Sequence, residues 1–177
     1  EHKTKFSVVR YGNVMGSRGS VIPFFIKEKV KGVLPITDKR MTRFMITLEE
    51  GVELVWEAFE DMNGGEIYVK KIPSMKVTDL AIAIDKDAVQ KIVGIRPGEK
   101  LHEEMIGEDD SFYTFEYDDY YKILPAINER SLSKELIKDG KRVEEGFSYT
   151  SDNNLEWMSV DTLQDWIENN VNKIGLI

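Results

Sequence analysis

The chain has 177 residues, of which 41% are hydrophobic and 32% are charged, a balance typical of a globular protein with one core or two small lobes. Its net charge of −8 disfavours general binding to nucleic acid or to an anionic membrane, although a local group of arginines would still accept an anionic small ligand. The absence of cysteine excludes disulfides, thiol nucleophiles and cysteine metal sites. No apolar run approaches the ~20 residues of a membrane helix and no signal peptide is visible, so we expect no membrane contact and a cytoplasmic location.

The first elements follow one another closely. Residues 6–11 are rich in β-branched and aromatic side chains and predict a strand that is apolar on both faces, as between two sheet neighbours. A glycine-rich loop covers residues 12–19. Ser20 then takes the N-cap position of a predicted helix over residues 21–31. Residues 33–37 contain a proline and therefore predict an edge strand at most.

A capping box at residues 47–50 opens the most regular predicted helix, residues 48–62. Its large apolar side chains recur every three or four residues, so we expect them to form a buried face. That face comprises Leu48, Val52, Val55, Trp56, Phe59 and Met62. The preceding residues 37–44 are densely polar, and two interpretations are open. Arg43 contacts a phosphate, or the segment is a solvated surface run in which Arg43 pairs with Asp38 or Glu49.

The second half of the chain is predicted to hold shorter elements. They are strands at residues 66–69, 91–95, 114–117 and 120–124, and helices at residues 79–84, 101–105 and 160–171. Residues 131–145 are polar and predicted to be irregular. The last helix is expected to direct Leu163, Trp166 and Ile167 inward. The alternation of strands and helices indicates an α/β or α+β fold.

The turn at residues 96–100, Arg-Pro-Gly-Glu-Lys, is the most informative short segment. Its proline and glycine force a sharp turn after a predicted strand. Arg96 offers a planar fork to phosphate oxygens, and the Glu99 carboxylate can accept hydrogen bonds from two neighbouring hydroxyls, as on a ribose. The pair suits a nucleoside diphosphate, and the alternative from composition alone is a turn with an ordinary ion pair.

The glycines of residues 12–19 lie between a strand and a helix, which invites a dinucleotide-binding interpretation. Asp38, 19 residues beyond Gly19, would then imitate the acid that binds a ribose. The spacing G-x-x-x-G-x-x-G differs from the G-x-G-x-x-G fingerprint, so a loop shaped for another ligand or for packing is favoured. Asn13 directly follows the strand, where α/β proteins place ligands, and it either reads a sugar hydroxyl or holds the loop.

No catalytic constellation or metal motif is apparent. His2 is close to the terminus and His102 lies in an acidic turn, where a structural role is favoured. Adjacent acids such as Glu103-Glu104 diverge on a helix or strand and are expected to be solvated. None of the tyrosines has a lysine four residues later, so the Tyr-x-x-x-Lys base pattern is missing.

Five segments, in order and spacing, are similar to one family. They are residues 9–25 (VRYGNVMGSRGSVIPFF), 36–44, 64–69 (GGEIYV), 72–76 (IPSMK) and 94–105 (GIRPGEKLHEEM), and residues 149–153 also resemble the family's end. The chain thus resembles the C-terminal half of inverting UDP-N-acetylglucosamine 4,6-dehydratases, which are polysaccharide biosynthesis proteins of the extended short-chain dehydrogenase/reductase superfamily. Met45 departs from the aromatic residue of that position.

The resemblance implies a Rossmann-type α/β fold in which residues 1–19 supply a late strand and loop of the cofactor sheet and residues 20–177 form a nucleotide-sugar substrate lobe. It implies NADP as cofactor, a UDP-sugar as substrate, and a role in nucleotide-sugar synthesis for surface glycans such as capsule or flagellin glycans. The family's glycine-rich cofactor loop and catalytic groups precede the part matched here, so no catalytic residue is assigned to this chain. The sequence opens at Glu1 without methionine, so we expect a piece of a longer protein. Because the family's catalytic groups are missing, we expect this piece to be inactive without its N-terminal half, and the resemblance implies a parent that is a homo-oligomer.

The resemblance also assigns residues to roles. Substrate-binding residues would be Asn13 at the sugar, Arg18, Gly19, Ser20, Val21 and Ile22 over the diphosphate and sugar, Pro35, Ile36 and Thr37 beside uracil, Arg43 and Arg96 on the diphosphate, and Glu99 on the ribose. Tyr11, Gly12 and Val14 would lie near the nicotinamide of the cofactor. The glycine loop is thereby assigned to substrate rather than cofactor.

Three alternatives remain from the sequence. The chain would be a non-catalytic nucleotide-sugar-binding module, a fragment of a related retaining dehydratase or 4-epimerase, or a small dinucleotide-binding domain.

Overall fold

The computed structural model describes residues 4–126 and 134–176. They form two compact units made of interleaved segments. The sheet unit takes the described parts of residues 1–11, 49–71 and 104–150, and the cavity unit takes those of residues 12–48, 72–103 and 151–177. The expected α/β architecture is confirmed, whereas the functional division of the chain at residue 19 stays a prediction.

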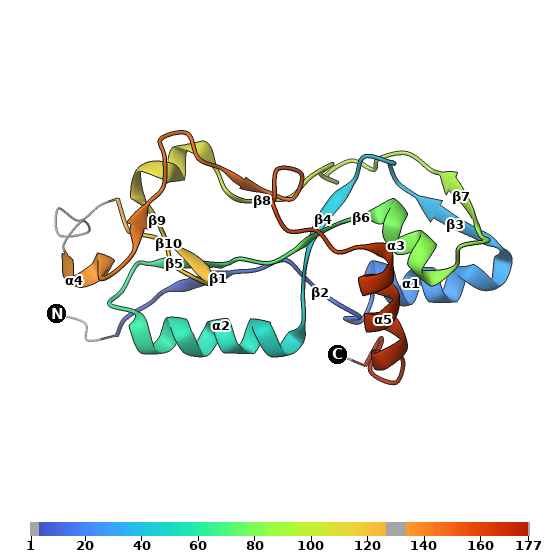
Figure 1. The fold of residues 1–177 in the computed structure, drawn as a ribbon, viewed down its shortest axis with the longest axis horizontal. Helices are drawn as coiled ribbons and strands as arrows, with labels where there is room; N and C mark the ends of the chain where they lie inside the picture. The colour runs from blue at the N-terminus through green and yellow to red at the C-terminus, as the bar shows by residue number, and fades with distance from the viewer. Residues whose placement is uncertain (1–3, 127–133, 177) are drawn as a thin grey trace. The chain divides into compact units, whose positions relative to one another are not determined.

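The sheet unit is built on a five-stranded mixed sheet (Figure 1). Its order is β1 (Val8–Arg10), β5 (Ile67–Lys70), β10 (Tyr120–Ile123), β9 (Thr114–Glu116) and β11 (Lys141–Arg142). Strands β1 and β5 run parallel, with Val9 opposite Tyr68, and the other pairs are antiparallel. The predicted strands at residues 6–11, 66–69, 114–117 and 120–124 are therefore confirmed. Among the described residues, β1 pairs with another strand on one side only, and the Val8 residue is 52% exposed.

Shorter elements complete the sheet unit. Strands β8 (Glu104–Ile106) and β12 (Tyr149–Thr150) pair antiparallel, and the 3-10 turn η2 (Glu108–Tyr113) follows β8. Helix α4 (Lys134–Ile137) and β11 lie within residues 131–145, so the expectation that this stretch is irregular was wrong for its described part. Residues 131–133 lie outside the described residues.

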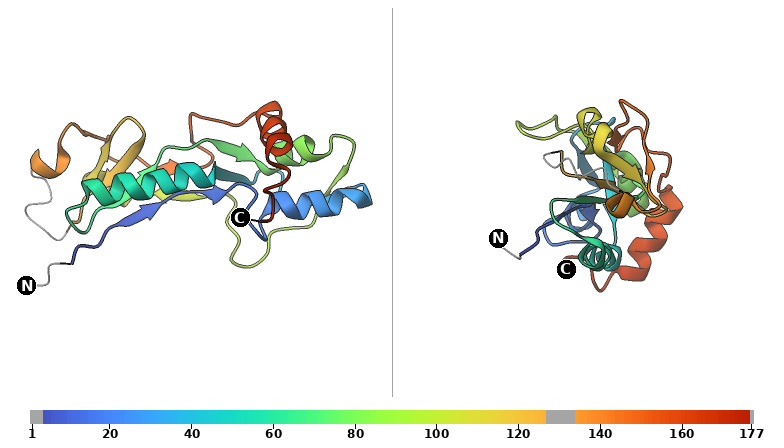
Figure 2. Two further views of the ribbon diagram at one scale, coloured as in Figure 1. Left: turned by 90° about the horizontal axis from the view of Figure 1, so that it is seen from below. Right: turned by 90° about the vertical axis from the view of Figure 1, so that its left-hand side faces the viewer.

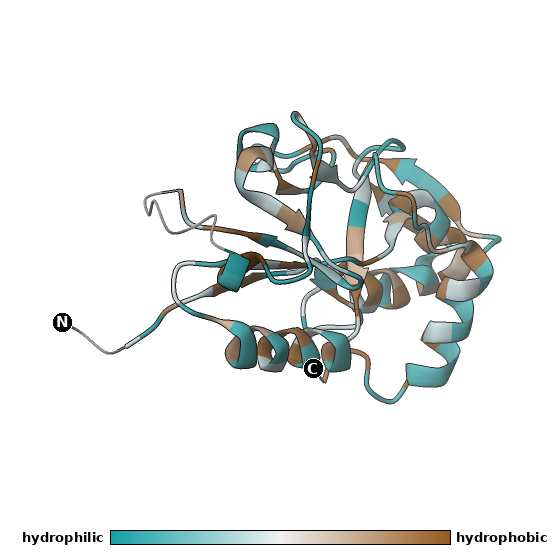
Figure 3. Ribbon diagram, turned by 60° about the vertical axis from the view of Figure 1, so that its left-hand side comes forward, coloured by the Kyte–Doolittle hydropathy of each residue, from teal (hydrophilic) through white to brown (hydrophobic). Residues whose placement is uncertain are grey.

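Helix α2 (Leu48–Asp61) runs alongside β1 and packs on the sheet (Figures 1 and 2). The predicted helix is confirmed, but the predicted buried face was wrong. The contact with the sheet is made by Leu54 and Ala58 against Tyr68, while Trp56 and Phe59 are 60% and 64% exposed. Small residues and one leucine let the helix approach the sheet closely, and the bulkier apolar stripe beside them is left outside. Figure 3 shows hydrophobic and hydrophilic bands alternating along α2.

The cavity unit combines short strands with three helices (Figure 1). Strand β4 (Thr42–Ile46) lies between β2 (Asn13–Val14), which is parallel to it, and β6 (Ser74–Lys76), which is antiparallel. A separate parallel pair joins β3 (Val33–Ile36) to β7 (Val89–Ile92). The helices are α1 (Val21–Glu28), which continues into the 3-10 turn η1 (Lys29–Lys31), α3 (Val77–Ile84) and α5 (Val160–Asn170).

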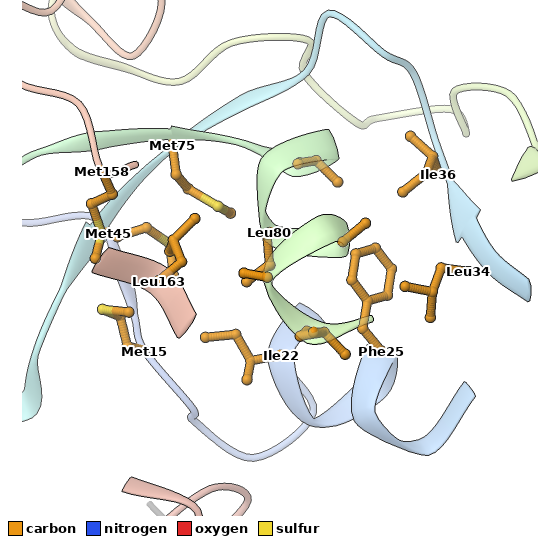
Figure 4. Close-up of a cluster of buried hydrophobic side chains, with 14 of the residues drawn as sticks. Met15, Ile22, Phe25, Leu34, Ile36, Met45, Met75, Leu80, Met158 and Leu163 are labelled. Carbon is orange, nitrogen blue, oxygen red and sulfur yellow. The ribbon is translucent and has the colours of Figure 1, made fainter. Parts of the chain in front are cut away.

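The core of the cavity unit lies between these helices and strands (Figure 4). Ile22, Leu80 and Leu163 come from α1, α3 and α5, and all three are fully buried. Leu163 together with Trp166 and Ile167 packs into this cluster, as predicted for the last helix. Five methionines also contribute to it, Met15, Met41, Met45, Met75 and Met158, whose flexible side chains fill irregular space.

The predicted helix at residues 101–105 was wrong. The Leu101 carbonyl accepts from the Thr42 amide (3.1 Å) and the Glu103 carbonyl accepts from the Ser151 amide (2.8 Å), so this backbone bonds to distant segments instead of closing helical turns. The strand β8 begins directly afterwards, at Glu104.

The solvated alternative for residues 37–44 was wrong for residues 42–44, which lie in strand β4, with Phe44 fully buried. Among the described residues, no helix has both the length and the apolar character needed to cross a membrane.

Candidate functional site

The cavity unit encloses a pocket of about 620 Å³, within the size range of small-molecule sites. Its wall is mostly apolar, with a few polar side chains that can orient a ligand. The lining residues are Asn13, Val14, Gly19, Ser20, Val21, Pro23, Phe24, Phe25, Lys27, Pro35, Thr37, Met41, Arg43, Met45, Met75, Val77, Val93, Arg96 and Glu99. Segments that are far apart in the sequence, the glycine loop, β3, β4 and the turn at residues 96–100, therefore meet at one site.

Most of the predicted site residues lie on this wall, and the exceptions have clear structural places. The side chains of Ile22 and Ile36 are fully buried in the core, so only their backbone is available to a ligand. Arg18 is exposed outside the lining residues. Tyr11 follows β1 in the sheet unit, and Gly12 packs closely against Phe44.

Two glycines of the loop are explained by packing. A Cβ on Gly12 would lie 2.5 Å from the Phe44 carbonyl oxygen, so the loop can approach β4 only with glycine there. Gly16 has a φ of +70°, and a Cβ on it would lie 2.9 Å from the Trp166 ring. These contacts are made within the protein, and they favour the packing interpretation of the glycine loop over a dinucleotide fingerprint.

Asp38, the acid of the dinucleotide alternative, is engaged elsewhere. Its carboxylate accepts hydrogen bonds from the Arg40 side chain (2.9 and 3.0 Å) and backbone amide (2.8 Å). These bonds lower the pKa of Asp38 to about 2. Asp38 lies outside the lining residues, so this alternative loses its ribose-binding acid.

Arg43 lines the pocket from β4, and its guanidinium also holds the segment that leads into the site. It donates to the carbonyl oxygens of Thr42 (2.6 Å), Leu101 (3.1 Å) and Lys100 (2.9 Å). Its Nε lies 3.6 Å from Oε1 of Glu103. Arg43 is therefore paired with Glu103 rather than with Asp38, and its side chain is tightly fixed before any ligand arrives.

The turn at residues 96–100 presents Arg96 and Glu99 on an exposed stretch. The Glu99 carboxylate accepts from the Arg96 backbone amide (3.0 Å), and the Arg96 carbonyl accepts from the Glu99 amide (3.1 Å). The two residues thus close the turn through one bond to the Glu99 side chain and one backbone bond, and Gly98 has the φ of +88° that the turn requires. The Arg96 guanidinium remains on the wall, where it can meet an anionic ligand.

Behind Asn13 lies Glu103, which sequence reasoning treated as a solvated acid. Its carboxylate accepts from the Phe44 backbone amide (3.2 Å) and faces the Asn13 side-chain amide, with both carboxylate oxygens 3.1 Å from the nitrogen when the NH2 group is turned toward them. Burial raises the pKa of Glu103, against the opposing effect of Phe44 and Arg43. No local pattern in the sequence marks this acid, because its contact with Asn13 joins residues that are 90 positions apart.

A hydroxyl network continues from this point. Thr42 Oγ1 lies 2.8 Å from Nδ1 of His102 and 2.7 Å from Oγ of Ser151, and the latter accepts from the Glu103 amide (2.9 Å). Thr42 and Ser151 are buried, so these bonds satisfy polar groups inside the unit. His102 has the structural role that the sequence indicated. No cluster of three metal-ligating side chains occurs within residues 4–126 and 134–176.

The N-terminus of α1 also borders the pocket. Ser20 is its N-cap, as predicted, but its hydroxyl makes no capping bond and has no hydrogen-bond partner within the described part of the chain. Lys27 and Phe24 of α1 line the wall as well, and sequence reasoning missed both.

Comparison with known proteins places these observations in a family. A family model described as polysaccharide biosynthesis protein matches residues 1–125. The chain is 55% identical, over 172 residues, to a UDP-N-acetylglucosamine 4,6-dehydratase (inverting) from Campylobacter jejuni subsp. jejuni serotype O:23/36 (strain 81-176), a match that covers 93% of this chain and 52% of the relative. It is 36% identical to a UDP-glucose 4-epimerase from Rickettsia conorii (strain ATCC VR-613 / Malish 7), covering 94% of this chain and 53% of that relative.

A solved structure agrees with the fold. The X-ray structure of Pen from Bacillus thuringiensis matches with a TM-score of 0.81 and 34% identity, over 96% of this chain and 51% of that chain. The chain thus spans about half the length of the curated relatives and of the solved structure that it matches.

Proposed function

The chain belongs to the polysaccharide biosynthesis protein family, and from that premise we propose that it is the substrate-binding part of an inverting UDP-N-acetylglucosamine 4,6-dehydratase. Its mixed α/β fold agrees with the C-terminal part of a Rossmann-type extended short-chain dehydrogenase/reductase. The full-length protein, meaning this sequence together with the half that the relatives carry in addition, would supply a nucleotide-sugar for surface glycans such as capsule or flagellin glycans, from a cytoplasmic location.

One observation carries the proposal, which is the convergence of Asn13, Arg43, Arg96 and Glu99 on a single pocket. Two guanidinium groups suit a diphosphate, and a carboxylate with an amide suits sugar hydroxyls. Pro35 and Thr37 lie on the same wall, where they would flank uracil. A UDP-sugar combines all of these groups in one ligand of suitable size.

The cofactor belongs mainly to the half that this chain lacks. Phe44 and Trp166 occupy the space beside the loop glycines Gly12 and Gly16, so this loop does not by itself fit a dinucleotide. We propose NADP as the cofactor, with Tyr11, Gly12 and Val14 near its nicotinamide only when the other half is present. When bound, it would supply hydride transfer, and this chain would supply the substrate pocket.

The proposed partners are the UDP-sugar, the N-terminal half and further copies of the full-length protein. Support for the N-terminal half comes from the exposed apolar stripe of α2 and from the open edge of β1. No catalytic residue is proposed within this chain, since its sequence lacks the Tyr-x-x-x-Lys pair of the family.

The test is to incubate UDP-N-acetylglucosamine and NADP with the full-length protein and with this chain alone, and to follow the sugar by NMR. We expect a 4-keto product inverted at C5 from the full-length protein and no turnover by this chain. Turnover by the chain alone would refute the assignment as a non-catalytic part.

The UDP-glucose 4-epimerase relative supports one alternative reaction. Epimerisation would return a sugar with the opposite C4 configuration and an intact C6 hydroxyl, whereas dehydration removes that hydroxyl. The same NMR spectra separate the two, and an epimerised product would replace the dehydratase proposal.

A further inference from the structure

We propose that Glu103 is a positioning residue that fixes the Asn13 amide with its oxygen available to the ligand, so that the site accepts a hydrogen bond from a sugar hydroxyl or N–H. This inference rests on the proposed function, because it concerns how that pocket recognises the sugar. Asn13 lines the pocket and Glu103 does not, so Glu103 would act through Asn13.

The orientation of the Asn13 amide follows from its neighbours. Its terminal group faces both oxygens of Glu103, at 3.1 Å each, and the Phe44 carbonyl oxygen, at 3.3 Å. All three neighbours are acceptors. An amide oxygen turned toward them would meet only repulsion, whereas the NH2 group can donate to them, so the hydrogen-bond network assigns the NH2 group to this side.

This assignment leaves the amide oxygen for the ligand. An amide has two donors on nitrogen and an acceptor on oxygen, and the donors are directed at Glu103 and Phe44. A sugar hydroxyl or an acetamido N–H can donate to that oxygen, while a carbonyl or ether oxygen cannot. The site would thus select a donor on the sugar.

Glu103 is itself held in place, as a positioning group must be. Phe44 donates its backbone amide to Oε2 (3.2 Å), and Arg43 Nε lies 3.6 Å from Oε1. The side chain of Glu103 is 29% exposed and that of Arg43 is 18% exposed, so water competes little for these bonds. A single carboxylate therefore supports two residues that line the pocket.

A carboxylate is required for this effect, since it accepts at both oxygens. In Glu103→Gln, the new side-chain oxygen would be taken by the Phe44 amide, and its NH2 group would face Asn13. The Asn13 amide would then rotate and present its NH2 group to the sugar. The sugar group at this position is also a donor, so no hydrogen bond would form. The variant changes one atom type and leaves the shape of the residue unchanged.

The test measures binding of UDP and of UDP-N-acetylglucosamine to the full-length protein by calorimetry. For Glu103→Gln we expect about a ten-fold or greater loss of affinity for the sugar nucleotide, from one charge-assisted bond network. The affinity for UDP, which lacks the sugar, should fall much less, because Arg43 keeps its three bonds to backbone carbonyls when the charge of Glu103 is removed. A purely structural role would lower both affinities together, and equal losses or no loss would overturn the proposal.

Two further variants complete the test. In an Asn13→Ala background, Glu103→Gln should have no additional effect on the sugar nucleotide, since its route of action is gone. The double variant Asn13→Asp/Glu103→Gln reverses donor and acceptor within the pair and again presents an oxygen to the sugar, so it should recover affinity lost in Glu103→Gln. This double variant also serves if the single one fails to fold. An undiminished effect in the Asn13→Ala background, or no recovery in the double variant, would contradict the role of Glu103.

The proposed function fails in a different way. If the unsubstituted full-length protein binds UDP-N-acetylglucosamine no better than UDP, then the pocket does not read the sugar and the substrate assignment is wrong. A clear sugar preference without the Glu103 effects would retain the proposed function and remove only the positioning role.

Discussion

At the scale of single residues, the two arginines of the pocket differ in how they are held. Arg43 donates to three backbone carbonyls, while Arg96 extends from an exposed turn that is closed by hydrogen bonds. A ligand phosphate would therefore meet one rigid guanidinium and one that is free to adjust. Their replacement should separate binding from stability.

We predict that Arg96→Ala lowers UDP affinity of the full-length protein about 10- to 150-fold without changing its melting temperature, since a charged hydrogen bond contributes about 1.5–3 kcal/mol. Arg43→Ala should lower both affinity and melting temperature, because Lys100 and Leu101 lose their donors. Calorimetry and thermal unfolding measure the two effects. Arg96→Lys is the control that keeps the charge and loses the fork, and it should recover part of the affinity.

If both alanine variants bind UDP as tightly as the unsubstituted protein, the pocket is not the diphosphate site. An equal fall in melting temperature for both variants would show that the backbone bonds of Arg43 add no stability beyond that of the exposed Arg96.

A second residue-scale feature is the buried ion pair of the sheet unit. Lys122 is 2% exposed and donates to Oδ2 of Asp61 (2.8 Å), and the Tyr68 hydroxyl donates to the same oxygen (2.7 Å). Lys138 also pairs with Asp61. Burial alone would raise the pKa of Asp61, but the bonds from Lys122, Lys138 and Tyr68 outweigh it and lower that pKa to about 2.

A carboxyl whose pKa is lowered by folding stabilises the folded state above its unfolded pKa and loses that effect as the pH falls. Asp61 should therefore contribute about 2 kcal/mol at neutral pH, and this contribution should disappear between about pH 4 and pH 2. Urea unfolding as a function of pH measures it. Asp61→Asn should flatten that part of the pH profile and, by leaving Lys122 unpaired, cost about 3–5 kcal/mol.

Asp118→Asn offers a control at an acid for which the described residues of the sheet unit provide no such network, and the pH profile of this variant should match that of the unsubstituted chain. An unchanged pH profile in Asp61→Asn would show that the pair does not govern acid stability.

At the scale of elements, the sequence predicted those that depend on local patterns. The helices at residues 21–31, 48–62 and 160–171 were foreseen because capping residues and apolar periodicity are local signals. The helix prediction for residues 101–105 was wrong because the carbonyls of this segment accept hydrogen bonds from Thr42 and Ser151. These partners are distant in the sequence, so no local pattern indicates them. The solvated alternative for residues 42–44 was wrong because polar residues of strand β4 are satisfied by distant groups, as Arg43 is by Glu103.

The residues of the site also differ in whether a local pattern in the sequence indicates them. The turn at residues 96–100 was visible as a candidate from its residue types, and the resemblance joined it to Asn13 and Arg43. Glu103 was not visible, since its function depends on a contact with Asn13 across 90 positions in the chain. A group that acts through another residue leaves no chemical signature of its own in the sequence.

Two glycines allow a direct test of element packing. A Cβ on Gly12 would approach the Phe44 carbonyl oxygen to 2.5 Å, so Gly12→Ala should force β4 away from the loop and cost about 1–3 kcal/mol of stability. Gly51 lies inside α2, where a Cβ would meet nothing within 4 Å, so Gly51→Ala should stabilise by about 0.5–1 kcal/mol. Denaturant unfolding of the two variants provides the matched comparison, and a neutral Gly12→Ala would refute the close approach.

At the scale of the whole molecule, the apolar stripe of α2 requires an explanation. Val52, Val55, Trp56 and Phe59 are all about half exposed or more, and they follow one another along the helix. Contiguous apolar surface of this kind marks a contact with another protein segment. Within the described part of the same unit, β1 has a strand partner on one side only, which leaves backbone groups that can pair with a further strand. Both features agree with a chain that spans about half the length of its relatives.

The last prediction uses this stripe in two settings. Trp56 and Phe59 should remain exposed in this chain and become buried in the full-length protein. Their rings are arranged edge to face, with 6.2 Å between the ring centroids. The double variant Trp56→Gln/Phe59→Gln should therefore reduce self-association of the isolated chain, yet destabilise the full-length protein by about 3–6 kcal/mol, since burial of each aromatic side chain contributes about 1.5–3 kcal/mol. Sedimentation and thermal unfolding measure the two effects. Leu155→Gln is the control, because this 97% exposed side chain should be neutral in both settings. A double variant that leaves the full-length protein as stable as before would place the stripe in solvent there too, and the covering half would have to dock elsewhere.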